Sequence, residues 1–146
     1  MRQSPPSLTE LTTYLLSRTG KSARGLLGAR LAARGLRLWH MAVLAALADF
    51  GPHAQRDLAD RLGIHPSDTA KVLEELSGSG YVARERDPAD RRRLVVTLTE
   101  EGRAELAELT GEAVRVRDEV LAPLTEAERA VLHGLLARVH AGLPRP

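Results

Sequence analysis

The sequence predicts a mainly α-helical fold that carries one small β-hairpin. Apolar residues recur at steps of three and four through most of the chain, which is the spacing of one helix face. Two short segments, residues 81–86 and 94–98, instead alternate in character and are rich enough in β-branched residues to be strands. With 146 residues, the chain has the length of one domain that can bury a real core, so we expect a single domain over residues 1–146.

The composition excludes several classes of protein. The chain has no Cys, so disulfides, thiol redox sensing and zinc-finger chemistry are all excluded. No basic start followed by an apolar run marks an N-terminal signal, and no segment approaches the length of a membrane span. These features predict a soluble, cytoplasmic protein with no membrane partner.

Charge is distributed unevenly along the chain. The net charge is only +2, which is too small by itself to indicate a nucleic-acid partner. Residues 1–37 carry seven basic and one acidic residue, whereas residues 99–130 carry four basic and nine acidic residues. Residues 53–93 carry eight of each sign. If this formally neutral segment binds DNA, its basic residues must gather on one face.

The N-terminal region is expected to be helical. Ser7, with Glu10 three residues later, fits a capping box that starts a helix. Leucines at helical spacing extend the pattern to Leu31. Three glycines weaken the interior of this helix and make it the expected place for a break: Gly20, Gly25 and Gly28. A second, compact helix is predicted over Leu38–Phe50, where a Gly-Pro pair ends it.

The next segment has the pattern of a helix-turn-helix. Gln55–Leu62 is its first predicted helix, and Gly63 follows at a C-cap position that favours a positive φ. Ile64 then fills the angle between two helices, as the turn of this motif requires. Pro66 lies at the first position of the second helix, where its missing N–H costs nothing. The inward-facing apolar residues of this helix leave six others outside: Ser67, Asp68, Ala70, Lys71, Glu74 and Glu75.

The two predicted strands enclose the sequence DPADRRR, a turn-forming start followed by three arginines, which predicts a β-hairpin wing with a basic tip. Thr99 then caps a long helix. Thr125 with Glu128 makes a capping box for a last helix. The apolar residues of the long helix follow steps of three and four, as in a coiled-coil seam: Leu106, Leu109, Ala113, Val116 and Val120. This order of elements suits placing a helix in a DNA groove with a basic arm beside it.

The segment from Leu36 to about Gly102 resembles the MarR family of winged helix-turn-helix transcriptional regulators. The matching pieces are LRLWHMAVLAALADFG, QRDLADRLGI, PSDTAKVLEELSGSGYV, RERDPADRRR and VTLTEEG. The most specific of them is the Asp-x-Arg signature of the wing, met by Asp90-Arg91-Arg92, which leads into the LTxxG start of the next helix.

The resemblance implies a winged helix-turn-helix over residues 36–102, with dimerisation helices over residues 1–35 and 103–146. It also implies a sequence-specific DNA-binding transcriptional regulator that binds a pseudo-palindromic operator as a homodimer. Most regulators of the family are repressors, released from DNA by a small-molecule effector.

By this resemblance, the helix from Pro66 to Ser77 would enter the major groove, where polar residues at its N-terminal end reach base edges. Lys71 could donate to guanine or to a phosphate, and Ser67 could bond either a base or a phosphate. Asp68 could accept from a cytosine amine or simply cap the helix, and we leave these alternatives open. Ala70 could meet a thymine methyl group.

At the wing, Arg92 fits the arginine with which the family enters the minor groove, whose negative potential attracts such a side chain. Asp90 is expected to orient a neighbouring arginine. Arg91 and Arg93 are predicted phosphate contacts, and the alternative is a merely solvated loop. Two further arginines alternate along the first strand and are candidates for contact with the DNA backbone: Arg84 and Arg86.

The family's effector pocket lies where the first two helices meet the long helix after the wing. Here that location points to three residues: Trp39, His40 and Val43. The sequence gives no chemical clue to a ligand, and the pocket could equally be filled and unused. His133 and His140 lie two helical turns apart, which is too wide for one ion without further ligands, so no metal site is predicted.

The alternative to a DNA-binding regulator is a winged helix that serves as a protein-interaction or dimerisation module without DNA binding. The neutral charge of residues 53–93 favours this alternative, and the three arginines at the wing tip disfavour it. No Ser-His-Asp arrangement, phosphate loop or paired carboxylates in an apolar setting indicate an enzyme, and no motif indicates a cofactor.

Overall fold

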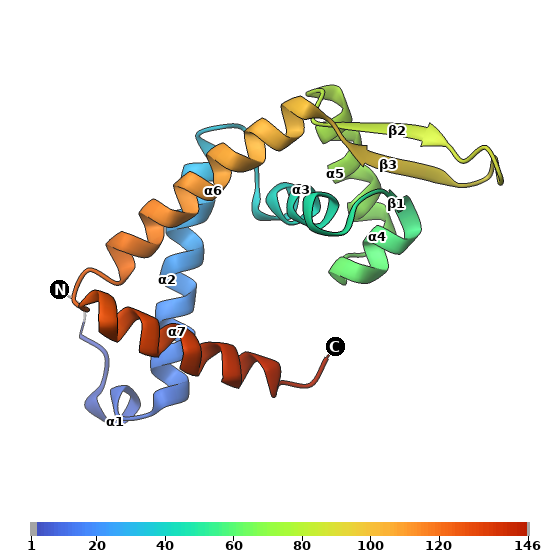
Figure 1. Ribbon diagram of the computed structural model, residues 1–146. Helices are drawn as coiled ribbons and strands as arrows, with labels where there is room; N and C mark the ends of the chain where they lie inside the picture. Colours follow the sequence, from blue (N-terminus) through green and yellow to red (C-terminus); the bar gives the residue numbers. More distant parts are fainter. Residues whose placement is uncertain (1–2, 146) are drawn as a thin grey trace.

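The computed structural model describes residues 3–145. Figure 1 shows a winged unit of helices and a small sheet, with a second group of helices to one side of it. The helix α6 (Glu100–Val120) starts beside the sheet and runs into this second group, where it lies against α2 (Thr12–Ala32). The elements in chain order are α1 Pro6–Thr9, α2 Thr12–Ala32, α3 Leu38–Phe50, β1 His53–Ala54, α4 Gln55–Leu62, α5 Pro66–Gly78, β2 Val82–Arg86, β3 Leu94–Leu98, α6 Glu100–Val120 and α7 Glu126–Ala141.

The core of the winged unit contains fully buried residues from α3, α4, α5 and the sheet. Leu44 of α3, Leu58 of α4, Leu73 and Leu76 of α5, and Val96 of β3 are all completely inaccessible to solvent. Burying a leucine side chain stabilises the fold by about 1.5–3 kcal/mol, so these residues fix the helices against the sheet. The mainly helical fold with a β-hairpin, predicted from the sequence, is therefore confirmed.

The sheet has three antiparallel strands in the order β1-β3-β2. In the hairpin, Val82 pairs with Leu98 and Arg86 pairs with Leu94. The third strand, β1, pairs His53 with Val96 and was not predicted. A strand of two residues has no alternation to detect, and its pairing depends on β3, which lies about forty residues further along the chain.

The N-terminal helices differ from the prediction at two points. The first helix begins at Pro6 with Pro5 as its N-cap, so Ser7 lies inside it and is not a cap. The break falls between α1 and α2, with Leu11 as the N-cap of α2, and not at the glycines, which lie within one continuous helix. Tertiary contacts between α2 and α6 outweigh the low helix propensity of Gly.

The contact between α2 and α6 is reinforced by ion pairs. Arg30 binds both Glu112, with 3.0 Å between Nη1 and Oε2, and Glu119. Arg34 donates through Nε to Glu105 Oε1 over 2.8 Å. Part of the basic charge of the N-terminal region and of the acidic charge of residues 99–130 therefore forms ion pairs between these two segments.

Both C-terminal helices start where the sequence predicted. Thr99 caps α6, and its hydroxyl oxygen accepts from the Gly102 N–H over 3.0 Å. Thr125 and Glu128 form the predicted capping box of α7, with backbone-to-side-chain bonds of 2.9 and 3.2 Å. The apolar stripe of α7 stays largely open to solvent, whereas Leu109 and Val116 of α6 are buried.

Candidate nucleic-acid interface

The turn between α4 and α5 follows from local sequence chemistry. Gly63 takes φ 65° and ψ 30°, a left-handed conformation that glycine adopts without steric cost. The Ile64 N–H then bonds to the Ala59 carbonyl over 3.1 Å, and the Ile64 side chain is buried at 7% exposure. Pro66 occupies the first turn of α5 as predicted. These contacts fix the angle at which α5 leaves the core.

The N-terminal end of α5 presents polar side chains to solvent. Ser67, Asp68 and Lys71 are exposed, and Ala70 is half-buried, so the predicted base-reading residues share an accessible surface. Thr69, between them, is completely buried and its hydroxyl donates to the His65 carbonyl over 3.2 Å. Asp68 was one candidate for the cap of this helix, but the cap is His65, whose side chain accepts from the Ser67 N–H.

The opposite face of α5 packs inward through Val72, Leu73 and Leu76, as predicted. Near its C-terminal end, Glu75 is held by α3 and by the residue that precedes α3. Arg37 donates through Nη2 to Glu75 Oε1 over 3.0 Å, and His40 Nε2 lies 3.2 Å from Glu75 Oε2. The carboxylate of Glu75 is therefore paired with Arg37 and His40.

The wing tip is a tight, internally bonded loop. The Asp87 N–H bonds to the Arg93 carbonyl and the Arg93 N–H bonds to the Asp90 carbonyl, both over 2.9 Å. Asp90 Oδ1 accepts from the backbone N–H of Arg92 over 3.1 Å and from its Nε over 3.2 Å. These two contacts lower the pKa of the Asp90 carboxyl, the backbone bond first. The Arg92 side chain is 91% exposed, so it is oriented and yet accessible.

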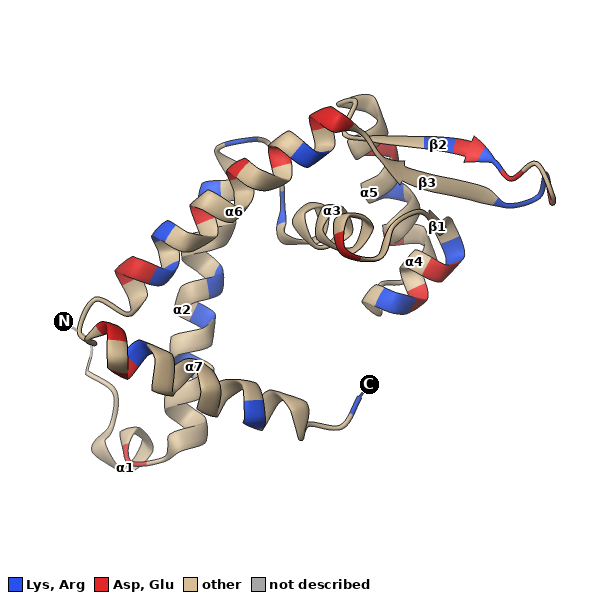
Figure 2. Cartoon of the chain, viewed as in Figure 1, with Lys and Arg blue, Asp and Glu red and all other residues tan. Residues whose placement is uncertain are grey.

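The other arginines of the wing have different environments. Arg93 pairs with Asp57 of α4, with 3.2 Å between Nη2 and Oδ2. Arg86 donates through Nη1 to the Arg91 carbonyl over 2.7 Å, while Arg91 itself is exposed. Arg84 lies on β2 opposite Val96 and is half-buried. Basic residues thus lie at the tip of the hairpin and recur on α4 (Figure 2).

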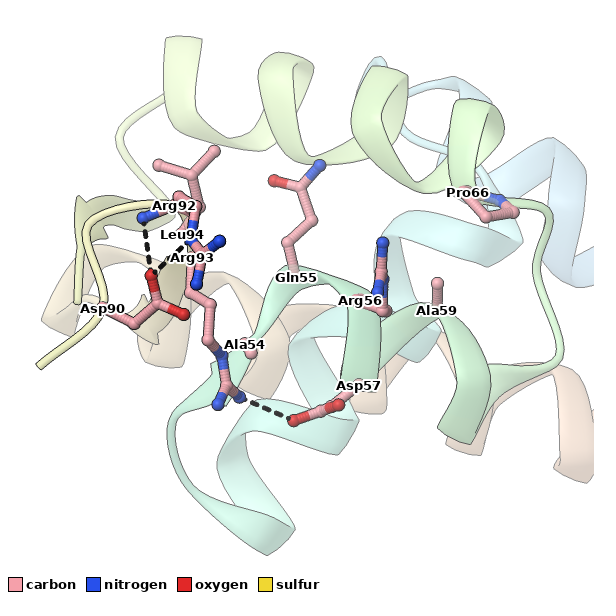
Figure 3. A pocket seen from close by; sticks show the side chains of 10 residues that line it. All are labelled: Ala54, Gln55, Arg56, Asp57, Ala59, Pro66, Asp90, Arg92, Arg93 and Leu94. Atoms are coloured by element: carbon pink, nitrogen blue, oxygen red, sulfur yellow. Dashed lines mark hydrogen bonds and ion pairs between the residues drawn. The ribbon is translucent and has the colours of Figure 1, made fainter.

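A cleft of about 910 Å³ separates the wing from α4 and the start of α5. Figure 3 shows that Gln55 and Arg56 of α4 extend into it, with Arg92 and Arg93 at one end and Pro66 at the other. The Gln55 Oε1 atom is buried and has no hydrogen-bond partner among the described residues. Sequence reasoning missed this cleft because it is formed by segments that are far apart in the chain.

A second cavity, of about 830 Å³, lies between α2, α6 and α7. It is lined mainly by apolar side chains, among them Leu15, Leu27, Val116, Val120 and Leu136. The family resemblance placed an effector pocket near three other residues, and none of them lines this cavity: Trp39, His40 and Val43.

Those three residues have separate roles in the structure. Val43 is completely buried in the core, and Trp39 is 47% exposed. His40 is 1% exposed, and its Nδ1 accepts from the Arg37 N–H over 2.8 Å. Burial lowers the pKa of His40, and the nearby Glu75 carboxylate opposes that shift. The two most buried of the three therefore belong to the packed interior.

Over residues 3–145, no group of three or more His, Asp or Glu side chains is placed to hold a metal ion. Within the same residues, no helix is both long and apolar enough to cross a bilayer.

Comparison with known proteins agrees with this geometry. The MarR family model matches residues 34–93. The HTH-type transcriptional regulator YdgJ of Bacillus subtilis is 31% identical over 108 residues, which are 74% of this chain and 66% of that protein.

Two solved structures cover nearly the whole chain. A probable transcriptional regulator from Pseudomonas aeruginosa is 33% identical, with a TM-score of 0.74, over 90% of this chain and 98% of that one. The PcaV transcriptional regulator from Streptomyces coelicolor, solved with its natural ligand, is 30% identical with a TM-score of 0.70, over 97% and 99%. The chain belongs to the MarR family of winged helix-turn-helix transcriptional regulators.

Proposed function

We propose that this protein is a homodimeric, sequence-specific DNA-binding repressor in which α5 enters the major groove and the wing enters the adjacent minor groove. The observation that carries the proposal is the arrangement at the cleft, where Pro66, at the start of α5, and the exposed, Asp90-oriented Arg92 line the same opening. A basic side chain held beside an exposed helix end is the arrangement that reads adjacent grooves.

Dimerisation is supported by the apolar surface of the terminal helices. Leucines and valines of α1, α2 and α7 that would be costly to leave in water are exposed in the single chain. A second copy related by a two-fold axis would cover them and would hold two α5 helices at once. The exposed set outside the cavity between α2, α6 and α7 includes Leu8, Leu11, Val131, Leu135 and Val139.

Release by an effector is supported by the cavity between α2, α6 and α7. Its lining is apolar apart from a few residues such as Thr12, Arg24 and Arg117, which suits a small, largely apolar molecule with one polar group. PcaV, which shares the fold and 30% of the sequence, was solved with a natural ligand. A ligand here would contact α6, which continues directly from β3 of the wing.

The test is selection of bound fragments from the source genome, followed by gel-shift titration at rising salt. A regulator of this kind selects a pseudo-palindrome whose half-sites lie about ten base pairs apart. If about six phosphates are contacted, its affinity falls about a thousandfold between about 50 and 200 mM salt. Enrichment of no fragment and absence of a salt-dependent shift would favour the protein-interaction module instead.

A further inference from the structure

The side chain of His65 folds back onto the first turn of α5. The backbone N–H of Ser67 donates to His65 Nδ1 over 3.2 Å, and the Ser67 hydroxyl oxygen lies 2.7 Å from the same nitrogen. A backbone N–H can only donate, so the ring nitrogen that it faces must carry a lone pair. In the neutral ring, the hydrogen is therefore on Nε2.

This tautomer fixes the hydrogen-bonding direction of Ser67. Because His65 Nδ1 has no hydrogen to give, the short contact with the Ser67 hydroxyl exists only if the hydroxyl donates. A hydroxyl has one hydrogen, and here it is used inside the protein. Ser67 is exposed, so what it presents outward is the pair of lone pairs on its oxygen.

We propose that His65 determines the base specificity of Ser67 by engaging its hydroxyl hydrogen, so that Ser67 accepts only and selects an amino group on a base edge. In the major groove, the amino donors are N6 of adenine and N4 of cytosine. Guanine, thymine and phosphate present acceptors at the corresponding positions, and an acceptor-only serine cannot bond them. This inference rests on the proposed function, because it requires α5 to lie in the groove.

The tautomer is tested first without DNA. In the full-length protein labelled with ¹⁵N at histidine, side-chain nitrogen shifts distinguish a ring protonated at Nε2 from one protonated at Nδ1. The signals of His65 are identified by their loss in His65→Asn. We expect the Nε2–H tautomer, and an Nδ1–H tautomer would overturn the proposal whatever the protein binds.

The specificity is tested on the operator recovered by fragment selection. Each base pair of a half-site is changed in turn, and the affinities of the wild type, Ser67→Ala and His65→Ala are compared. At one position, the wild type should prefer adenine or cytosine over guanine or thymine about fivefold, the size expected for one neutral hydrogen bond. Both variants should lose that preference.

His65→Asn is the matched control. Asparagine is a favoured N-cap whose side-chain oxygen can accept from both the backbone N–H and the hydroxyl of Ser67, so this variant should keep the preference. Thermal unfolding of each variant checks that α5 stays folded. If Ser67→Ala or His65→Ala keeps the preference for adenine or cytosine, the proposed role of His65 is wrong, while the proposed binding to the operator is unaffected. Failure of every variant and of the wild type to select DNA would overturn both proposals.

Discussion

Arg93 of the wing and Asp57 of α4 form an ion pair across the cleft, with 3.2 Å between Nη2 and Oδ2. Both side chains are more than half exposed, so the pair contributes little to stability. The pair does hold the guanidinium group of Arg93 against a carboxylate of the same protein. We therefore expect Asp57→Asn to release Arg93 for a phosphate, to tighten operator binding, and to steepen the plot of log affinity against log salt by about 0.9 for the added contact.

Asp60→Asn provides the control for this prediction. Asp60 is an exposed carboxylate on the same helix, and its loss changes the net charge equally without freeing Arg93. The salt slope of Asp60→Asn should match that of the wild type. Equal slopes for Asp57→Asn and Asp60→Asn would show that Arg93 makes no phosphate contact when it is released.

Arg92 and Asp90 should act on DNA as a unit. Arg92→Ala is expected to weaken operator binding about tenfold or more, with no change in thermal stability, because the side chain is 91% exposed. Asp90→Ala should weaken binding less, by releasing the Arg92 side chain from its orientation. In the double variant, the loss of Asp90 should add nothing, and additive losses in a double-mutant cycle would show that Asp90 acts independently.

The buried His40 predicts a specific dependence of stability on pH. Burial lowers its pKa in the folded protein, so between that lowered value and the unfolded value of about 6.5 the unfolded chain binds more protons. The free energy of unfolding therefore falls as the pH decreases below about 6.5. Calorimetric melting temperatures measured from pH 7.5 down to 5 should show this fall.

His40→Gln should remove that part of the pH dependence. The glutamine oxygen can accept from the Arg37 N–H and its amide can donate to Glu75, which reproduces both contacts of the neutral ring without a titrating group. A variant with the same slope of melting temperature against pH as the wild type would assign the acid sensitivity to other groups.

The features that the sequence predicted are those whose causes lie within a few residues of one another. Gly63 allows a left-handed turn and Pro66 suits a first helical turn, whatever the rest of the chain does. The two-residue strand that begins at His53 was missed because it exists only by pairing with β3. The contact of the buried His40 with Glu75, 35 residues away, could not be predicted either, since a periodic pattern does not show which helices meet.

The exposed stripe of α7 should be an interface between two copies of the chain. Leu135 is 50% exposed in the single chain, and a charge placed there would have to be buried in the dimer. Leu135→Glu is expected to give monomers in sedimentation equilibrium and to lose operator binding, because one α5 alone reads half a site. Ala137→Glu, on the other side of the same exposed helix, should remain dimeric. Dimeric Leu135→Glu would place the interface elsewhere.

Gly102, the final glycine of the LTxxG segment, lets the first turn of α6 pack closely against the base of the wing. A Cβ at Gly102 would overlap the Tyr81 carbonyl oxygen and approach Leu98 Cδ1 to 2.8 Å, and the backbone there cannot yield without moving β2. Gly102→Ala should therefore lower the free energy of unfolding by about 1–3 kcal/mol, the cost of overpacking. Gly111→Ala, in the same helix with only the flexible Arg115 nearby, should raise it by about 0.5–1 kcal/mol. Urea unfolding of the two variants measures both changes, and stabilities that shift in the same direction would show that close packing at Gly102 does not determine the effect.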